Sequence, residues 1–262
     1  MTPNPAAKAD LSPEDRYRAP ALDKGLDILE LLSEQPQGLT RAEIVKAMGR
    51  SPSEIYRMLE RLVARHYVAR SPEGDRYALS LKLYVLAQRH PPLQRLVARA
   101  QPAMDAFATA AEQSCHLGVY DRGNVTIVAQ VASPNQWSLQ LRPGARVSLV
   151  DTGSGQALLA FQDDPPRAAM LREHEALDGE APIDEAELAR VLRGVRQRGY
   201  GQAPSRQTQG VIDISVPVLG PGGVAHAVLT CPFMRRIDRH VGPDADEARV
   251  LLQRTAASLS VA

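Results

Sequence analysis

Residues 39–79 constrain the fold of this chain most strongly, because their pattern predicts two short helices, a turn and a basic hairpin in that order. Thr40 is a suitable N-cap for the first helix, and Glu43 three residues later completes a capping box. Gly49 favours the left-handed conformation that ends a helix, and Ser51-Pro52 is typical of the start of the next one. A turn between two such helices holds the second helix away from the body of the domain.

The second of these helices has one apolar face and several polar ones. Ile55, Leu59 and Leu62 recur at helical spacing and are expected to face a core. Residues 67–69 and 76–79 flank a turn-rich loop and predict a two-stranded wing. This order of elements predicts a winged helix-turn-helix, whose second helix enters the major groove of double-stranded DNA. The side chains expected to contact DNA are Thr40, Arg41, Ser51, Ser53, Tyr56, Arg57, Arg61, Arg70 and Arg76.

Local charge bears on the choice between DNA and other partners. An alternative reading of the same pattern is a small helical domain whose hairpin binds another protein or no partner. Residues 39–82 contain nine Lys and Arg against five Asp and Glu, whereas the whole chain has a formal net charge of +1. A basic excess confined to one segment is expected where that segment meets phosphates, so the charge favours DNA.

The length of 262 residues allows two domains, each with a core of its own. Residues 1–20 are polar and rich in proline, which predicts a disordered tail and not a signal peptide. The sequence has no run of 18 apolar residues, so we expect a cytoplasmic protein without a membrane partner. Cys115 and Cys231 lack metal-ligand spacing, and the sequence predicts neither a metal site nor a cofactor.

Beyond the tail, the pattern divides the chain into three segments. Residues 21–80 are predicted to form the winged helix-turn-helix domain. Residues 81–100 are predicted as a linker helix region, in which His90-Pro91-Pro92 ends a helix and marks a joint between domains. Residues 101–262 are predicted to form the second domain. The apolar stripe expected on the first helix, over residues 21–33, consists of Leu22, Leu26, Leu29 and Leu32.

The second domain mixes helices and strands. Residues 93–113 predict a helix that is kinked or restarted at Pro102, and residues 115–133 predict a hairpin around a turn at 121–124. Further helices are expected over residues 152–161, 165–173, 184–198 and 243–259, and strands over 212–218 and 225–230. Strands and helices in this order, without strict alternation, predict an α+β domain around an antiparallel sheet.

Several stretches together resemble the IclR family of transcriptional regulators, and the resemblance covers about residues 20–260. The matching stretches are residues 21–26 (ALDKGL), 51–53 (SPS), 77–79 (YAL), 152–160 (TGSGQALLA), 198–200 (RGY), 216–218 (VPV) and 229–230 (LT). Each stretch is weak alone, but their common order and spacing is specific. The resemblance implies a winged helix-turn-helix, a linker helix and an effector-binding domain of GAF/profilin-like fold.

The resemblance also implies partners. Proteins of this family are usually homodimers or dimers of dimers that bind pseudo-palindromic operators. A small-molecule effector, often an organic acid from catabolism, changes DNA binding or the contact with RNA polymerase. The linker and the effector-binding domain then correspond to residues 81–100 and 101–262.

The residues themselves also indicate where an effector pocket would lie. Gly153-Ser154-Gly155 precedes an apolar helix, and small residues there leave backbone N–H groups free at the helix N-terminus, which suits a carboxylate. An alternative is that these glycines only make a tight turn. By similarity to the family, the pocket also takes side chains from Gln136, Leu139, Val211, Asp213 and Thr230.

The chain departs from the family pattern around this pocket. Gln156 stands where the family usually has Lys or Arg, and Gln209 lies near a position where an acid is common. Asp213 occupies an inward strand position that is more often small or apolar. A buried Asp is costly unless it is paired, so Asp213 either caps backbone donors or accepts from a ligand hydroxyl or amine. In the second case a hydroxylated or nitrogen-bearing acid fits better than a simple di-acid.

Two other classes of protein, an enzyme and an architectural DNA-binding protein, fit the sequence less well. An enzyme acting on a small organic acid lacks support, because no catalytic triad spacing, phosphate-binding loop or metal motif is present. His116 follows Cys115, but alternation along a strand sends the two side chains to opposite faces. An architectural DNA-binding protein gains most of its affinity from phosphate contacts, and the nearly neutral charge of this chain argues against that class.

Overall fold

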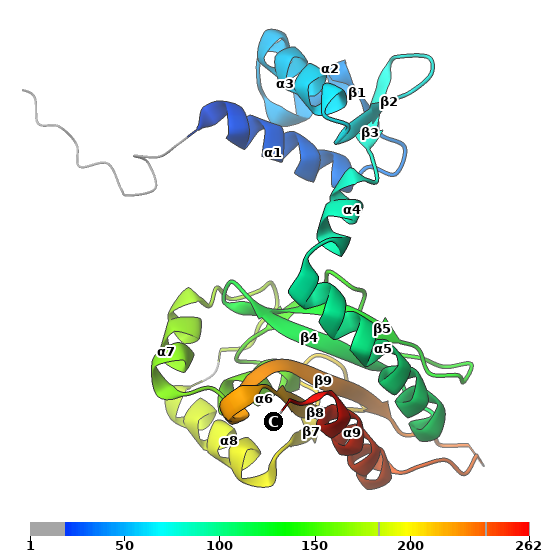
Figure 1. Ribbon diagram of the computed structural model, residues 1–262, viewed down its shortest axis with the longest axis vertical. Coiled ribbons are helices and arrows are strands. Elements are labelled where there is room, and N and C mark those ends of the chain that lie inside the picture. Colours follow the sequence, from blue (N-terminus) through cyan, green and yellow to red (C-terminus); the bar gives the residue numbers. More distant parts are fainter. Residues whose placement is uncertain (1–18, 183, 239, 262) are drawn as a thin grey trace, which may run out of the picture. The chain divides into compact units, whose positions relative to one another are not determined.

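The computed structural model describes residues 19–182, 184–238 and 240–261 (Figure 1). The predicted tail, residues 1–20, lies outside the described residues except for Ala19 and Pro20, and Pro20 begins the first helix. Contacts within the chain fall into two units that meet between His90 and Pro91. The mixed α and β architecture predicted from the sequence is confirmed.

The first unit is a winged helix-turn-helix. Its three-stranded antiparallel sheet has the order β1-β3-β2, and β2 and β3 form the wing. Its core is formed by Ile28, Leu32, Ile44, Ile55, Leu59, Val68 and Tyr77. The elements are α1 (Pro20–Ser33), β1 (Leu39–Thr40), α2 (Arg41–Met48), α3 (Pro52–Ala64), β2 (Val68–Arg70), β3 (Arg76–Leu79) and α4 (Lys82–Gln88).

The predicted caps of the two central helices are confirmed. The Thr40 N–H donates to Glu43 Oε2 at 2.7 Å, and the Glu43 N–H donates to Thr40 Oγ1 at 3.3 Å, which completes the capping box. Gly49 ends α2 at φ 58°, in the left-handed region that glycine adopts without strain. The hydroxyl of Ser51 donates to Glu54 Oε2 at 2.7 Å at the start of α3. These local bonds fix the sharp turn between α2 and α3.

The stripe predicted for α1 is wrong in its first half. Leu22 and Leu26 are 61% and 48% exposed, whereas Ile28 and Leu32 are buried. The face of α1 that meets α3 is displaced around the helix, because it is set by Ile28, Leu32 and an ion pair between Lys24 and Glu54 of α3.

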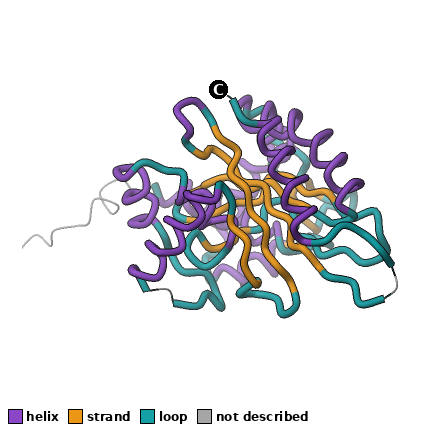
Figure 2. The backbone as a smooth tube through the Cα atoms, turned by 90° about the horizontal axis from the view of Figure 1, so that it is seen from below, coloured by secondary structure: helices purple, strands orange, loops and turns teal. Residues whose placement is uncertain are grey.

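The second unit is built on a six-stranded antiparallel sheet with the order β6-β5-β4-β9-β8-β7. Helices flank this sheet on both sides (Figure 2). One face packs against α5 and α9, and the other packs against α6 and α8. The elements are α5 (Pro91–Ala111), β4 (Cys115–Asp121), β5 (Asn124–Val131), β6 (Arg146–Ser148), α6 (Gly153–Ala160), α7 (Asp164–Glu173), α8 (Glu185–Arg198), β7 (Gly201–Pro204), β8 (Val211–Leu219), the 3-10 turn η2 (Pro221–Gly223), β9 (Ala225–Met234) and α9 (Ala245–Leu259).

Prolines and one edge strand account for the errors in the second unit. A helix does end before His90-Pro91-Pro92, since α4 ends at Gln88, but α5 begins at Pro91, two residues earlier than predicted, because the first positions of a helix need no N–H donor. Pro102 lies inside α5, which continues through it. β7 was not predicted, since its four residues include a glycine and a proline and it lies at the edge of the sheet.

A nearly buried ion pair ties the segment after α7 to the β4–β5 turn. His174 Nδ1 lies 2.8 Å from the carbonyl oxygen of Gly123, and Nε2 lies 2.7 Å from Glu180 Oε1. Burial raises the pKa of Glu180, but hydrogen bonds from the Leu177 N–H and from His174 outweigh it, so this pKa lies below its ordinary value. The Glu180 carboxylate accepts at this contact, so the His174 imidazole donates to it.

We expect His174→Gln to lower the free energy of unfolding at pH 7 by about 1–3 kcal/mol, since it removes the imidazole that donates to the nearly buried Glu180 carboxylate. Because the pKa of Glu180 is depressed in the folded protein, the contribution is complete above the ordinary glutamate range and is lost as pH falls below it. Urea denaturation of both proteins at pH 7 and pH 4 measures the difference. The exposed Glu175→Gln is the control, and a loss at pH 7 no larger than in this control contradicts the assignment.

Candidate DNA-reading surface and effector cavity

The polar side of α3 is free to meet a ligand. Ser53, Tyr56, Arg57 and Arg61 are all exposed on it, and Ser51 is exposed at its start. Arg41, from the beginning of α2, lies over the ring of Tyr56 with its guanidinium carbon 5.5 Å from the ring centre. The structure thus brings the residues predicted on α2 and α3 onto one surface.

Two of the predicted arginines also have structural contacts. Arg76 is half-buried, and its Nη1 donates to the carbonyl oxygen of Gly38 at 2.8 Å. Arg70 Nε donates to the carbonyl oxygen of Gly74 at 2.6 Å, which closes the tip of the wing. A guanidinium has five N–H donors, so these bonds leave donors for phosphate oxygens. Thr40 is half-buried in its capping box, and contact of all these residues with DNA stays a prediction.

The second unit contains a cavity of about 70 Å³ at the N-terminus of α6. It is enclosed by residues from β4, β8 and β9, by the segment before β6, and by the loop between β7 and β8. Six of the predicted effector-binding residues line it, namely Leu139, Gly153, Ser154, Val211, Asp213 and Thr230.

Two predicted residues do not line the cavity. Gln136 is exposed in the loop after β5, because this loop turns away before Leu139 returns to the cavity. Gly155 is buried against Leu149, whose carbonyl oxygen would lie 2.1 Å from an added Cβ. An added Cβ on Gly153 would lie 2.8 Å from Ser215 Oγ. Both glycines therefore allow a close approach of α6 to its neighbours, and neither has a positive φ, so the tight turn considered from the sequence is wrong.

A chain of buried polar side chains forms one wall. His116 Nε2 lies 3.4 Å from Ser154 Oγ, Ser154 Oγ lies 2.8 Å from Thr230 Oγ1, and Thr230 Oγ1 lies 2.9 Å from Ser215 Oγ. Burial lowers the pKa of His116 to about 4, so its imidazole is neutral at neutral pH. The wall offers hydroxyl and imidazole groups without a net charge.

His116, which lines the cavity, and Ser215, which bonds to Thr230 from outside the lining, were not predicted for this site. Alternation did place His116 and Cys115 on opposite faces, and Cys115 packs in the core with its Sγ 3.8 Å from the Met104 carbonyl oxygen. The same alternation, applied to β8 from Asp213, would have found Ser215 two residues further on.

Asp213 is the carboxyl group of the cavity wall. Burial raises its pKa, and a hydrogen bond from the Ser205 side chain opposes this only in part. Within the described residues, no backbone N–H donates to this carboxylate, so the capping role considered from the sequence has no donor here. The carboxylate therefore has capacity to accept a hydrogen bond from a ligand.

Cationic side chains are not part of the cavity lining among the described residues. Gln156, which replaces the usual Lys or Arg, donates through Nε2 to the Val150 carbonyl oxygen at 2.9 Å and so points elsewhere. Arg142 and Arg146 are exposed and do not reach the cavity. A ligand carboxylate would depend on the α6 N-terminus and the hydroxyl groups.

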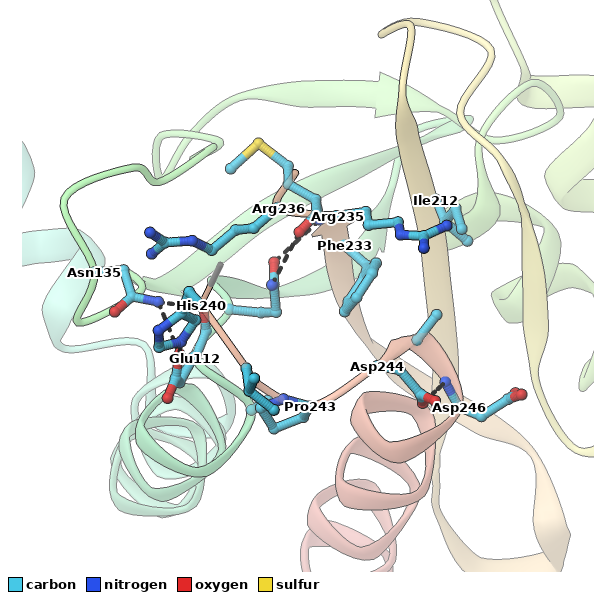
Figure 3. A pocket seen from close by; sticks show the side chains of 16 residues that line it. Glu112, Asn135, Ile212, Phe233, Arg235, Arg236, His240, Pro243, Asp244 and Asp246 are labelled. Carbon is cyan, nitrogen blue, oxygen red and sulfur yellow. Dashed lines mark hydrogen bonds and ion pairs between the residues drawn. The ribbon is translucent and has the colours of Figure 1, made fainter. Parts of the chain in front are cut away.

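A second, larger cavity of about 580 Å³ lies between the end of β9 and the start of α9 (Figure 3). Its polar side chains are largely paired with each other. Glu112 accepts from Asn135 Nδ2 at 3.1 Å and lies 2.5 Å from His240 Nε2, and Arg236 is paired with Asp238. None of the predicted effector residues lines this cavity, so we assign it no ligand.

The part of the chain that the structure describes contains no group of three or more His, Cys, Asp or Glu side chains placed to hold a metal ion. It also contains no helix that is both long and apolar enough to cross a membrane.

Family comparisons cover both units. The model of the bacterial transcriptional regulator IclR C-terminal domain matches residues 93–261, and that of the IclR helix-turn-helix domain matches residues 21–72. The chain therefore belongs to the IclR family of DNA-binding transcriptional regulators, as the resemblance predicted.

Individual relatives agree with this assignment. The HTH-type transcriptional regulator KdgR of Escherichia coli K12 is 31% identical over 230 residues, covering 87% of this chain and 86% of the relative. The p-hydroxybenzoate hydroxylase transcriptional activator of Acinetobacter baylyi is 26% identical and covers 98% of this chain and 95% of the relative. These relatives are regulators, which favours a regulator over an enzyme.

Solved structures show the same fold. An IclR transcriptional regulator from Alicyclobacillus acidocaldarius has a TM-score of 0.71 at 25% identity and covers 93% of this chain and 98% of its own. An IclR homolog from Microbacterium hydrocarbonoxydans, solved as a complex with 4-hydroxybenzoate, has a TM-score of 0.74 at 22% identity and covers 92% of this chain and 97% of its own.

We expect Asp213→Asn to raise the free energy of unfolding at pH 7 by about 0.5–1 kcal/mol, since it removes a charge that burial disfavours. The raised pKa means that the penalty is present above the folded pKa and fades as pH falls through it. Thermal unfolding at pH 7 and pH 4 measures the effect, with the exposed Asp178→Asn as control. A destabilised Asp213→Asn would mean that the carboxylate is paired after all.

Proposed function

We propose that this protein is a homodimeric, sequence-specific regulator whose operator binding responds to a small organic acid held in the α6 cavity. The observation that carries the proposal is the presence, in one chain, of an exposed polar helix in a winged helix-turn-helix and a polar cavity in a separate unit. Reading DNA and sensing a small molecule are then tasks of different units.

The DNA contacts follow from the surface of α3. Ser51, Ser53, Tyr56, Arg57 and Arg61 enter the major groove, where their polar groups meet base edges. Four residues of α2 and the wing hold flanking phosphates, namely Thr40, Arg41, Arg70 and Arg76. Phosphate contacts fix the register of the protein on DNA, and the base contacts supply sequence preference.

An exposed apolar helix supports the dimer. No residue of α4 is buried, and Leu81, Leu83, Tyr84, Val85 and Leu86 are all exposed on or beside it, with Leu81 at 77%. Apolar side chains exposed around a short helix in this way favour burial against a second copy. Two copies related by a two-fold axis require a pseudo-palindromic operator with half-sites about one helical turn, or a multiple, apart. Association into a dimer of dimers and contact with RNA polymerase are further parts of the proposal.

The cavity supports an acid that also carries a hydroxyl or amine. The α6 N-terminus and the hydroxyls of Ser154 and Thr230 suit one carboxylate, and Asp213 suits a hydrogen-bond donor of the ligand. The similar protein bound to 4-hydroxybenzoate supports an aromatic or other organic acid as the class. A di-acid fits less well, because the described lining offers no cation for its second carboxylate.

Effector binding is proposed to act through residues 90–95, which join the two units in sequence. A ligand shifts a conformational equilibrium only by its difference in affinity for the two arrangements, typically about 1–3 kcal/mol. Such a difference changes operator affinity by roughly one order of magnitude or more.

The function is tested by selecting operators from a random pool of double-stranded DNA with the full-length protein at near-physiological salt. We expect an inverted repeat, because each subunit reads one half-site. The selection is repeated with a set of hydroxylated, amino and simple organic acids, and we expect a member of the first two groups to change retention. Failure of folded protein to enrich any sequence, with or without the acids, contradicts the proposal.

We expect Arg57→Ala to weaken binding to the selected operator by about 1–3 kcal/mol and to relax preference at one base position of each half-site. The physical reason is that a guanidinium can donate two hydrogen bonds to a guanine edge. Titrations with the operator and with single-base variants measure both effects. Arg190→Ala, an exposed arginine of α8, is the control, and an equal loss on all sequences would make Arg57 a phosphate contact.

A further inference from the structure

The loop between β7 and β8, residues 205–210, covers one side of the effector cavity. Ser205, Gln207 and Thr208 line the cavity. The loop closes on itself, since the Ser205 N–H donates to the Val211 carbonyl oxygen at 2.8 Å. Gly210 has φ +80°, a conformation that glycine adopts without strain, so a glycine allows the loop to turn back into β8. We call residues 205–210 the strap.

Arg206 of the strap interacts with Asp151, outside the cavity lining. Arg206 Nε lies 2.5 Å from Asp151 Oδ1, and the Asp151 side chain is 3% exposed. This oxygen receives no hydrogen bond of good geometry from the described residues, so the guanidinium acts on it mainly as a charge. Arg206 Nη1 also lies 3.7 Å from Glu187 Oε1 of α8.

Asp151 is itself fixed in place. Its Oδ2 accepts from the Ala181 N–H at 3.1 Å. The next residue, Thr152, caps α6 through a hydrogen bond from the Gly155 N–H to its Oγ1 at 3.2 Å. Asp151 is therefore a rigid and nearly buried anchor at the start of α6. Within the described residues, Arg206 makes the ion pairs that connect the strap to neighbouring segments. One pair reaches Asp151 before α6, and the other reaches Glu187 of α8.

The cavity is small, so the wall that covers it must move before a larger ligand can bind. A cavity of about 70 Å³ is roughly half of the ~150 Å³ that accommodates benzene. An organic acid with a ring or a chain of several carbons cannot enter unless part of the wall moves. Two parts of the wall form no strand or helix, namely the strap and the segment before β6 that carries Leu139 and Leu141, whereas α6, β4, β8 and β9 are packed in the core. Of these two described parts, the strap is the one that an ion pair holds in place.

We propose that the strap is a gate of the effector cavity and that Arg206, held on Asp151, is the latch that sets how often it opens. The ion pair favours the closed strap, and its loss raises the fraction of open cavity. Arg206 is thus a positioning residue for the strap and makes no contact with the effector. This inference rests on the proposed function for its biological meaning, but the opening itself can be measured without DNA or effector.

The test uses a thiol placed inside the cavity. Ser154→Cys puts a reactive group on the wall with little change in volume, and methyl methanethiosulfonate is a small probe for it. Full-length Ser154→Cys protein is compared with the same protein carrying Arg206→Ala, Asp151→Asn or Arg206→Lys. Labelling over time is read by peptide mass spectrometry, and Arg193→Ala, an exposed arginine of α8, is the matched control.

We expect labelling at position 154 to become about tenfold faster with Arg206→Ala and with Asp151→Asn, and to stay within about twofold of the parent with Arg206→Lys and Arg193→Ala. Cys115 and Cys231 are buried in the core on the opposite face of the sheet and report global unfolding. In a local opening of the strap these two thiols stay as protected as in the parent.

Two results would overturn the latch. One is labelling at position 154 that does not change in either Arg206→Ala or Asp151→Asn. The other is an increase at position 154 that is matched by Cys115 and Cys231, because the substitution then loosens the whole unit. Either result leaves the proposed function intact. A confirmed latch in a protein whose operator binding ignores every acid tested would instead contradict the proposed function.

Discussion

The second unit depends on how closely α6 approaches β8 and the turn that precedes the helix. With Gly153 and Gly155 at its first positions, α6 lies nearer to Ser215 and to the Leu149 carbonyl than any side chain would allow. This approach brings Ser154 within hydrogen-bond distance of Thr230 and beside His116. A larger residue at Gly153 would separate the helix from β8, and one at Gly155 would collide with the Leu149 backbone in the turn before α6. Either change would interrupt the polar wall of the cavity.

The DNA-binding unit could be predicted in detail because its signals are local. The capping box of Thr40 and Glu43, the left-handed Gly49 and the Ser51-Pro52 helix start each act within a few residues of the chain. Such bonds do not depend on distant segments, so the sequence shows them directly. The stripe on α1 failed for the opposite reason, because its buried face is chosen by packing and by the Lys24 contact with α3.

The cavity could be predicted only in part. The glycine-rich helix start identified Gly153 and Ser154, and the family resemblance supplied Asp213 and Thr230, but the bend of the loop that excludes Gln136 leaves no signal in the sequence. The sequence does not place His116 at this site, because its partner Ser154 is 38 residues away and is brought near only by the fold. Arg206 could not be predicted for the same reason, since Asp151, with which it pairs, lies on a different segment of the chain. Long-range pairs such as these need the three-dimensional arrangement.

The strands that build the cavity wall also build the core, on alternate residues. Along β9, Leu229 and Cys231 face α5 and α9 whereas Thr230 and Pro232 face the cavity, and β8 repeats the scheme with Ile214 between Asp213 and Ser215. Ligand preference can therefore diverge in evolution one cavity position at a time without a cost in the core. A one-residue insertion in either strand would exchange the core-facing and cavity-facing residues. Apolar residues such as Ile214 or Cys231 would then face the ligand, and the hydroxyl groups would be buried in the apolar core.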